Sequence, residues 1–165
     1  MDVAIVGGGI TGAALAWRFA DAGLRVALVE AARIGRGSTA ASTALLMQEP
    51  DADLTELAQR YGWRRARRIW QLSLAATNDF VDTLTRLRIN ATSCATTRCT
   101  TRPIGKRSRA CATSIDEGWR PDPRQLFALG HGGNGMTFGF LASRLLLDWY
   151  RGNRSKDHAL FAFSR

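Results

Sequence analysis

The stretch Val3-Ala-Ile-Val-Gly-Gly-Gly-Ile-Thr-Gly12 decides the fold. Its first four residues form a run too apolar for an exposed strand, and its glycines at 7, 9 and 12 form G-x-G-x-x-G where a helix over residues 13–22 is expected to begin. A second apolar run, Val26–Val29, follows and ends in Glu30. This order of strand, glycine turn, helix and strand predicts a dinucleotide-binding βαβ unit in an α/β fold.

Each glycine of this turn has its own predicted role. Gly7 permits the tight turn out of the strand, Gly9 lets the backbone approach a pyrophosphate, and Gly12 lets the helix pack closely on the sheet. The phosphates are expected on the helix N-terminus, where free amides and the positive end of the helix dipole favour an anion. Ile10 and Thr11 lie within the glycine motif just before this helix, so we include them among the candidate cofactor-binding residues.

Glu30 stands eighteen positions after Gly12, at the end of the second apolar run. A carboxylate there accepts hydrogen bonds from a ribose 2′-hydroxyl and repels a 2′-phosphate, which argues against NADP. The alternative is an ordinary α/β turn with a surface glutamate.

Length and composition indicate one globular domain, or one domain and a fragment, because 165 residues with 45% hydrophobic content can bury a core. No export signal or membrane-spanning run is visible, so we expect a cytoplasmic protein without a membrane span. Three cysteines, an odd number, suit reduced thiols better than disulfides. The spacing of Cys94, Cys99 and Cys111 fits no usual zinc site, so no metal is expected.

The formal net charge of +9 comes almost entirely from arginine. The densest basic run, Trp63-Arg-Arg-Ala-Arg-Arg-Ile69, has aromatic neighbours and raises the possibility of a nucleic-acid partner. Without a nucleic-acid-binding motif, we favour a solvated helix face whose arginine stems cover apolar surface.

The loop over residues 31–43 contains small and hydroxyl-bearing side chains that follow the second strand. Ser38, Thr39 and Ser42 are candidates to donate hydrogen bonds to phosphate or flavin oxygens. They are equally suited to cap the next helix, and the sequence leaves both interpretations open.

The middle of the chain divides into two contrasting parts. Asp53 and Glu56 resemble a helix-starting capping box, and helical spacing of apolar residues then continues to about residue 89. From Asn90 the sequence becomes rich in Thr, Ser and Arg, with few large aliphatic residues. We expect a poorly ordered connector there.

A second strand, glycine-rich turn and helix are predicted near the C-terminus. The apolar run Gln125–Leu129 is the expected strand, and an apolar helix is expected over residues 136–150. The candidate cofactor-binding residues of this turn are His131, Gly132, Gly133, Asn134, Gly135 and Thr137. His131 is read either as a group beside a flavin ring or as a structural histidine bonded to a backbone carbonyl.

With both glycine turns in view, the chain resembles the FAD-dependent oxidoreductases of the D-amino-acid oxidase and glycine or sarcosine oxidase type. The N-terminal turn with Glu30, then Gly37-Ser-Thr-Ala-Ala-Ser42, is similar to that family's first FAD segment. Gly130-His-Gly-Gly-Asn-Gly-Met-Thr137 is similar to its last flavin segment. The resemblance implies a Rossmann-like FAD-binding domain with FAD as the cofactor.

The chain also departs from that family, whose members are much longer and hold their substrate on a mixed sheet. Most of that sheet is expected to be missing here. We therefore divide the chain into residues 1–89, the N-terminal part of the FAD-binding domain, a connector over 90–124, and residues 125–165, which complete the FAD-binding domain. No catalytic residue can be carried over.

Three functions are compatible with these motifs and charges. The first is FAD-dependent oxidation of a C–N bond in a small amino acid or secondary amine by hydride transfer to flavin, or an inactive shortened remnant of such an enzyme. The second is a non-catalytic module that binds FAD or ADP. The third, an arginine-rich nucleic-acid-binding protein, rests only on the basic run.

Overall fold

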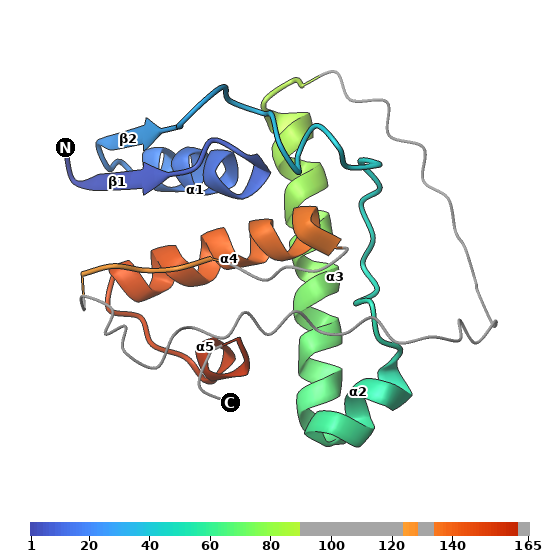
Figure 1. The fold of residues 1–165 in the computed structure, drawn as a ribbon. Helices are drawn as coiled ribbons and strands as arrows, with labels where there is room; N and C mark the ends of the chain where they lie inside the picture. Colours follow the sequence, from blue (N-terminus) through green and yellow to red (C-terminus); the bar gives the residue numbers. More distant parts are fainter. Residues whose placement is uncertain (90–123, 129–133, 162–165) are drawn as a thin grey trace, which may run out of the picture.

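The structure, a computed structural model, describes residues 1–89, 124–128 and 134–161. Figure 1 shows a small sheet and a set of helices in these parts of the chain. The elements in chain order are β1 (Val3–Val6), α1 (Ile10–Asp21), β2 (Val26–Val29), α2 (Leu54–Tyr61), α3 (Trp63–Arg86), α4 (Gly135–Tyr150) and α5 (Lys156–Leu160).

The two strands and α1 form the βαβ unit that the sequence predicts. β1 and β2 pair in parallel with Val3 opposite Val26 and Val6 opposite Val29. A parallel pair needs a crossover connection, and α1 supplies it. The helix begins at Ile10, three residues before the expected start at 13, because the turn between strand and helix is short.

The face of the sheet opposite α1 is open within the described residues. Ile5 points to the helix side and is 8% exposed, whereas its neighbour Val6 is 87% exposed. Val29, the partner of Val6 in the register, is 55% exposed. Strands alternate their side chains between two faces, so these two valines form one bare apolar strip.

Helix α4 lies along α1 and runs in the same direction (Figure 1). The two helices approach closely near their N-termini at Thr11 and Gly139. Further along, the rings of Phe19 and Tyr150 meet with centroids 5.7 Å apart. The βαβ unit at the start of the chain is therefore covered by a helix from its other end.

The long helical region expected after residue 53 is two helices rather than one. Gly62 separates α2 from α3 and has φ +80°, a left-handed conformation that glycine adopts without steric cost. The predicted start is confirmed, because the Asp53 side chain accepts a 2.8 Å hydrogen bond from the Glu56 amide. Helix α3 ends at Arg86, close to the expected limit of 89.

The core lies on both sides of α3, which touches α2 at one end and α4 further along. One cluster of buried residues joins α2 to α3, and a second joins α3 to α4. They consist of Leu57, Ala58, Ala66 and Ile69 in the first cluster and Leu72, Ala76, Leu141 and Leu145 in the second. Leu160 and Phe161 pack against both clusters and fix the end of the described chain.

The strand expected over Gln125–Leu129 is not found, because residues 125–128 have no regular structure and Leu129 lies outside the described residues. A strand forms only by pairing, and the described sheet contains β1 and β2 alone. The connector expected over 90–124 lies outside the described parts except for its last residue, and so do His131, Gly132 and Gly133. None of the described helices is long and apolar enough to cross a membrane.

Candidate functional site

The turn between β1 and α1 is held tightly against the sheet. Gly7 has φ +103° and donates its amide to the carbonyl of Val29 over 2.8 Å. A Cβ placed on Gly12 would lie 1.8 Å from the Gly7 carbonyl oxygen, which is far inside van der Waals contact. Gly12 therefore lets the first turn of α1 pack directly on the glycine turn, in the role that the sequence pattern predicts.

Some amides in the glycine turn and at the start of α1 have acceptors within the described residues, and others have none. Gly8 donates to Glu30 Oε2 over 2.7 Å, and Ile10 donates to Thr39 Oγ1 over 3.0 Å. The amides of Thr11 and Gly12 donate to no acceptor within the described residues. Such first-turn amides and the positive end of the helix dipole make this turn suited to an anion.

Glu30 lies beside this turn as an ionised carboxylate. The hydrogen bond from the Gly8 amide, followed by the bond from the Ala32 amide, lowers the pKa of Glu30 below its ordinary value. A carboxylate has about four acceptor positions, so capacity remains for hydroxyl donors. Glu30 therefore combines two roles, since it fixes the turn and offers oxygen acceptors at its edge.

The loop after β2 folds back over the same turn. Thr39 reaches the start of α1, and the amide of Gly35 donates to the Gly8 carbonyl over 2.9 Å. Ser42 accepts a hydrogen bond from the amide two residues further on, which is a local turn contact. Ser38 is exposed and makes no side-chain hydrogen bond within the described residues. The structure thus brings Thr39 to the site, whereas the Ser42 side chain is engaged within its own loop.

The start of α4 is anchored to the segment before α2. Asn134 and Thr137 are 3% and 1% exposed. The Asn134 side-chain amide donates to the carbonyl of Glu49, and Thr137 Oγ1 donates to that of Met47 over 2.7 Å. A Cβ on Gly135 would meet open space. Both predicted polar groups therefore hold a neighbouring segment, although Asn134 Oδ1 is buried without a hydrogen-bond partner in the described chain.

The N-termini of α1 and α4 lie at the same end of the helix pair (Figure 1). A Cβ on Gly139 would lie 2.7 Å from Thr11 Oγ1, so glycine at this position allows the close approach. Sequence reasoning did not identify Gly139, although a lone glycine inside an apolar helix often marks close packing. The two predicted glycine turns consequently precede parallel helices whose dipoles point the same way.

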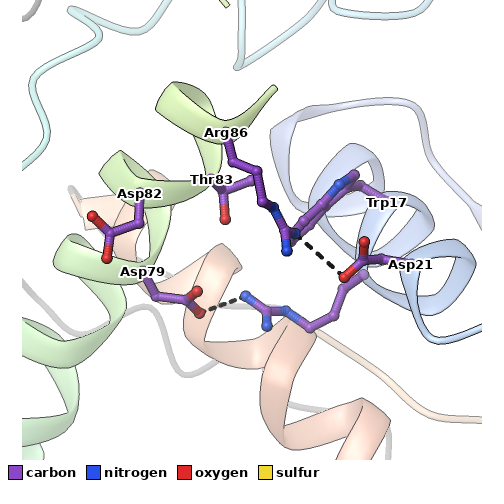
Figure 2. Close-up of a pocket in the computed structure, with 7 residues that line it drawn as sticks. Trp17, Asp21, Asp79, Asp82, Thr83 and Arg86 are labelled. Carbon is purple, nitrogen blue, oxygen red and sulfur yellow. Dashed lines mark hydrogen bonds and ion pairs between the residues drawn. The ribbon is translucent and has the colours of Figure 1, made fainter. Parts of the chain in front are cut away.

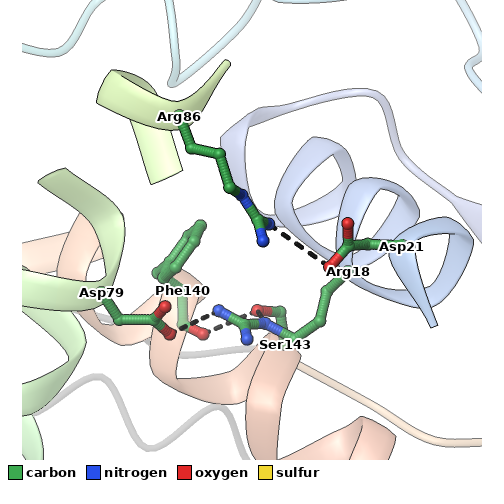
Figure 3. Close-up of polar contacts among 6 residues, drawn as sticks. All are labelled: Arg18, Asp21, Asp79, Arg86, Phe140 and Ser143. Carbon is green, nitrogen blue, oxygen red and sulfur yellow. Dashed lines mark hydrogen bonds and ion pairs between the residues drawn. The ribbon is translucent and has the colours of Figure 1, made fainter. Parts of the chain in front are cut away.

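A polar connection behind the site ties α1 to α3 and α4 (Figure 3). Arg18 donates to Asp79 over 2.6 Å and to Ser143 Oγ over 2.9 Å. Its guanidinium carbon lies 4.7 Å from the centre of the Phe140 ring, and its side chain is only 14% exposed. Sequence reasoning overlooked Arg18, because nothing local shows that an arginine in α1 faces two other helices.

Arg18 also lines a cavity of about 220 Å³ between α1 and α3, with Trp17, Asp21, Asp79, Asp82, Thr83 and Arg86 (Figure 2). Most charged side chains that line the cavity pair with one another: Arg18 donates to Asp79, and Arg86 donates to Asp21 over 3.3 Å. We interpret the cavity as part of the connection between the helices. Within the described ranges no three His, Cys, Asp or Glu side chains converge as metal ligands would.

A family model described as DAO, FAD dependent oxidoreductase, matches residues 2–120, which is more than half of the chain. The chain belongs to the FAD-dependent oxidoreductase family. Membership implies a Rossmann-like FAD-binding fold, and the glycine turn with Glu30 lies within the matched range.

Two curated proteins are similar over 66 residues, 40% of this chain. One, the protein YhfW of Bacillus subtilis strain 168, is 39% identical and is named as a candidate Rieske 2Fe-2S iron-sulfur protein. The other, gamma-glutamylputrescine oxidoreductase of Escherichia coli strain K12, is 38% identical. The similar segment covers only 13% and 16% of these proteins. No solved structure gives a significant match.

Proposed function

We propose that this chain binds FAD with its pyrophosphate on the first turn of α1 and its ribose beside Glu30. The observation that carries the proposal is the glycine turn itself. At that turn, the free amides of Thr11 and Gly12 and the ionised Glu30 carboxylate lie within one short segment. Family membership supports FAD as the dinucleotide.

The residues of the turn fit both parts of such a ligand. Helix amides donate to phosphate oxygens without any cationic side chain. Thr39 Oγ1 accepts from the Ile10 amide, so its own hydroxyl proton is left to donate to a phosphate. Glu30 accepts from hydroxyl groups and disfavours a second phosphate on the ribose.

We further propose that the reaction is oxidation of a C–N bond in an amino acid or secondary amine. FAD supplies the hydride acceptor, while the protein binds and orients the reactants. Support comes from the family and from the similarity to an oxidoreductase whose name specifies an amine substrate. His131, Gly132 and Gly133 are the residues of the second turn proposed to lie near the flavin, with Asn134 and Gly135 at the start of α4.

A non-catalytic FAD- or ADP-binding module is the second candidate. The observation favouring it is that Asn134 and Thr137 donate to the carbonyls of Glu49 and Met47. The Thr137 hydroxyl proton and one Asn134 amide proton are consequently not available to a flavin ring, whereas the amides of Thr11 and Gly12 remain free for a nucleotide.

Titration of the purified chain with FAD and with ADP tests the proposal. Gly9→Val should abolish saturable binding of both, because the added methyl groups occupy the approach to the turn. Ala20→Val places the same valine side chain at an exposed position of α1 and should leave binding unchanged. Equal affinities in wild type and Gly9→Val would exclude this turn. Binding without turnover of amino acids or amines would favour the non-catalytic module.

A further inference from the structure

A second cavity of about 230 Å³ is lined by residues of α2, α3 and α5. Helices α2 and α5 lie away from the sheet and its glycine turn (Figure 1). The cavity is formed by the last turn of α2, the first two turns of α3 and the end of α5. Its lining residues are Arg60, Tyr61, Arg65, Ile69, Ala159 and Leu160.

The wall supplied by α5 is fixed to the rest of the fold. Arg68 of α3 donates two hydrogen bonds, of 2.8 and 2.7 Å, to the Asp157 carboxylate. The side-chain hydrogen bonds from Arg68 lower the pKa of Asp157, so this pair stays ionised at neutral pH. The ring Nε2 of His158 also lies 2.9 Å from the Leu145 carbonyl oxygen. The α5 wall of the cavity is therefore held in place by contacts with α3 and α4.

The cavity is lined by both arginine and apolar side chains. Arg65 is exposed and makes no ion pair within the described residues, whereas Arg60 pairs with Glu56. Ile69, 6% exposed, belongs to the core cluster beneath, and Leu160 packs against the same cluster. A ligand that fills this space therefore meets both arginine and aliphatic side chains.

The surrounding charges also favour an anion. Residues 56–68 contain five arginines and one acid, Glu56, and the first turn of α3 contains no acid. The acid contributed by α5, Asp157, is already paired with Arg68. The net local charge around the cavity is accordingly positive.

We propose that this cavity binds a small organic carboxylate with a short apolar body. The planar fork of an arginine matches the two oxygens of a carboxylate, and the apolar floor accepts the carbon chain. The volume is below the range of about 300–1,000 Å³ for pockets that hold drug-sized ligands, which restricts the ligand to a few carbons. The site uses none of the residues of the glycine turn and is independent of FAD binding.

Titration of the whole chain with hexanoate, followed by NMR chemical shifts, tests the proposal. Hexan-1-ol keeps the apolar body without the charge, and acetate keeps the charge with almost no apolar body. We expect saturable binding of hexanoate and weaker binding of both comparison ligands. Arg65→Gln should weaken hexanoate binding about tenfold or more, because a charge-assisted pair is lost.

Arg64→Gln is the matched control, since it removes the same charge from a neighbouring exposed position that does not line the cavity. It should change the affinity by less than about twofold, as expected for screened surface charge. Equal weakening in both variants would show diffuse attraction and overturn the proposal. Equal binding of hexan-1-ol, or no saturation by about 10 mM hexanoate, would also overturn it. Far-UV circular dichroism checks that both variants fold.

Discussion

Gly12 tolerates substitution least among the residues of the glycine turn. A methyl group there would overlap the backbone carbonyl of Gly7, which cannot move without displacing β1 from α1. We expect Gly12→Ala to destabilise the fold by about 3 kcal/mol or more. Gly9→Ala should cost under about 1 kcal/mol, because Gly9 has φ −76° and its added methyl would meet only Thr39 Oγ1 at 3.1 Å.

Urea unfolding of both variants measures this difference. The comparison is matched, since the two substitutions add one methyl group each to the same turn. If Gly12→Ala lowers the free energy of unfolding no more than Gly9→Ala does, the packing of α1 against the turn is contradicted.

Glu30 should make stability depend on pH in the acid range. Its folded-state pKa is lowered by amide hydrogen bonds, chiefly from Gly8, so the contribution is fully present above the unfolded-state pKa of about 4.3. It is lost as the pH falls through the lower folded-state pKa. The stability difference between wild type and Glu30→Gln should therefore shrink on acidification. A difference that stays constant from pH 7 to about pH 2 would contradict these bonds.

Sequence reasoning at the residue scale succeeded where the determinants are local. The spacing of Gly7, Gly9 and Gly12 after an apolar run is enough to predict the turn. The position of Glu30 beside the turn is observed, and its contact with a ribose stays a prediction. The partners of Asn134 and Thr137 could not be predicted, because their acceptors lie 85 and 90 residues away. No local pattern encodes such a contact.

At the scale of elements, the close approach of α1 and α4 depends on Gly139. Gly139→Ala should destabilise the fold by about 1–3 kcal/mol, because its methyl would meet Thr11 Oγ1 at 2.7 Å. Thr11→Ala removes that oxygen and should restore most of the loss in the double variant. Chemical denaturation of the two single variants and the double variant gives the interaction energy. Strictly additive losses would show that the two helices do not meet there.

Arg18 links three helices, so its substitution should lower the free energy of unfolding more than substitution of its partner Asp79. The pair is partly shielded, with the two side chains 14% and 35% exposed, so its strength lies between those of surface and buried pairs. We expect the free energy of unfolding to fall by about 2 kcal/mol in Arg18→Met and by about 1 kcal/mol in Asp79→Asn. The double variant should lose less than the sum, and a double-mutant cycle checks this.

The helices and strands were predictable in proportion to their local signals. β1, β2 and the start of α2 follow from apolar runs and a capping residue, as the structure confirms. The break at Gly62 was missed because the apolar spacing continues on both sides of it. The strand expected at 125–129 was wrong because an apolar run alone does not supply a pairing partner.

At the scale of the whole molecule, the bare strip of Val6 and Val29 is the most conspicuous apolar surface of the sheet. Parallel strands are usually covered on both faces. We expect the chain to bind a hydrophobic dye through this strip, and Val6→Thr with Val29→Thr to reduce dye fluorescence while retaining the strands. Val81→Thr changes an exposed valine of α3 and serves as the control. Equal fluorescence in the sheet variant and the control would contradict the expectation.

The pairing of α1 with α4 also has a consequence during synthesis of the protein. Arg18 and Ser143, which bond across this pair, are 125 residues apart, so a ribosome adding about 5–20 residues per second makes α1 on the order of ten seconds before α4. Throughout that interval the nascent chain lacks the helix that covers Trp17 and Phe19. The first half of the protein is therefore synthesised before the helix that covers these aromatic rings, and exposed apolar surface of this kind favours aggregation until α4 is made.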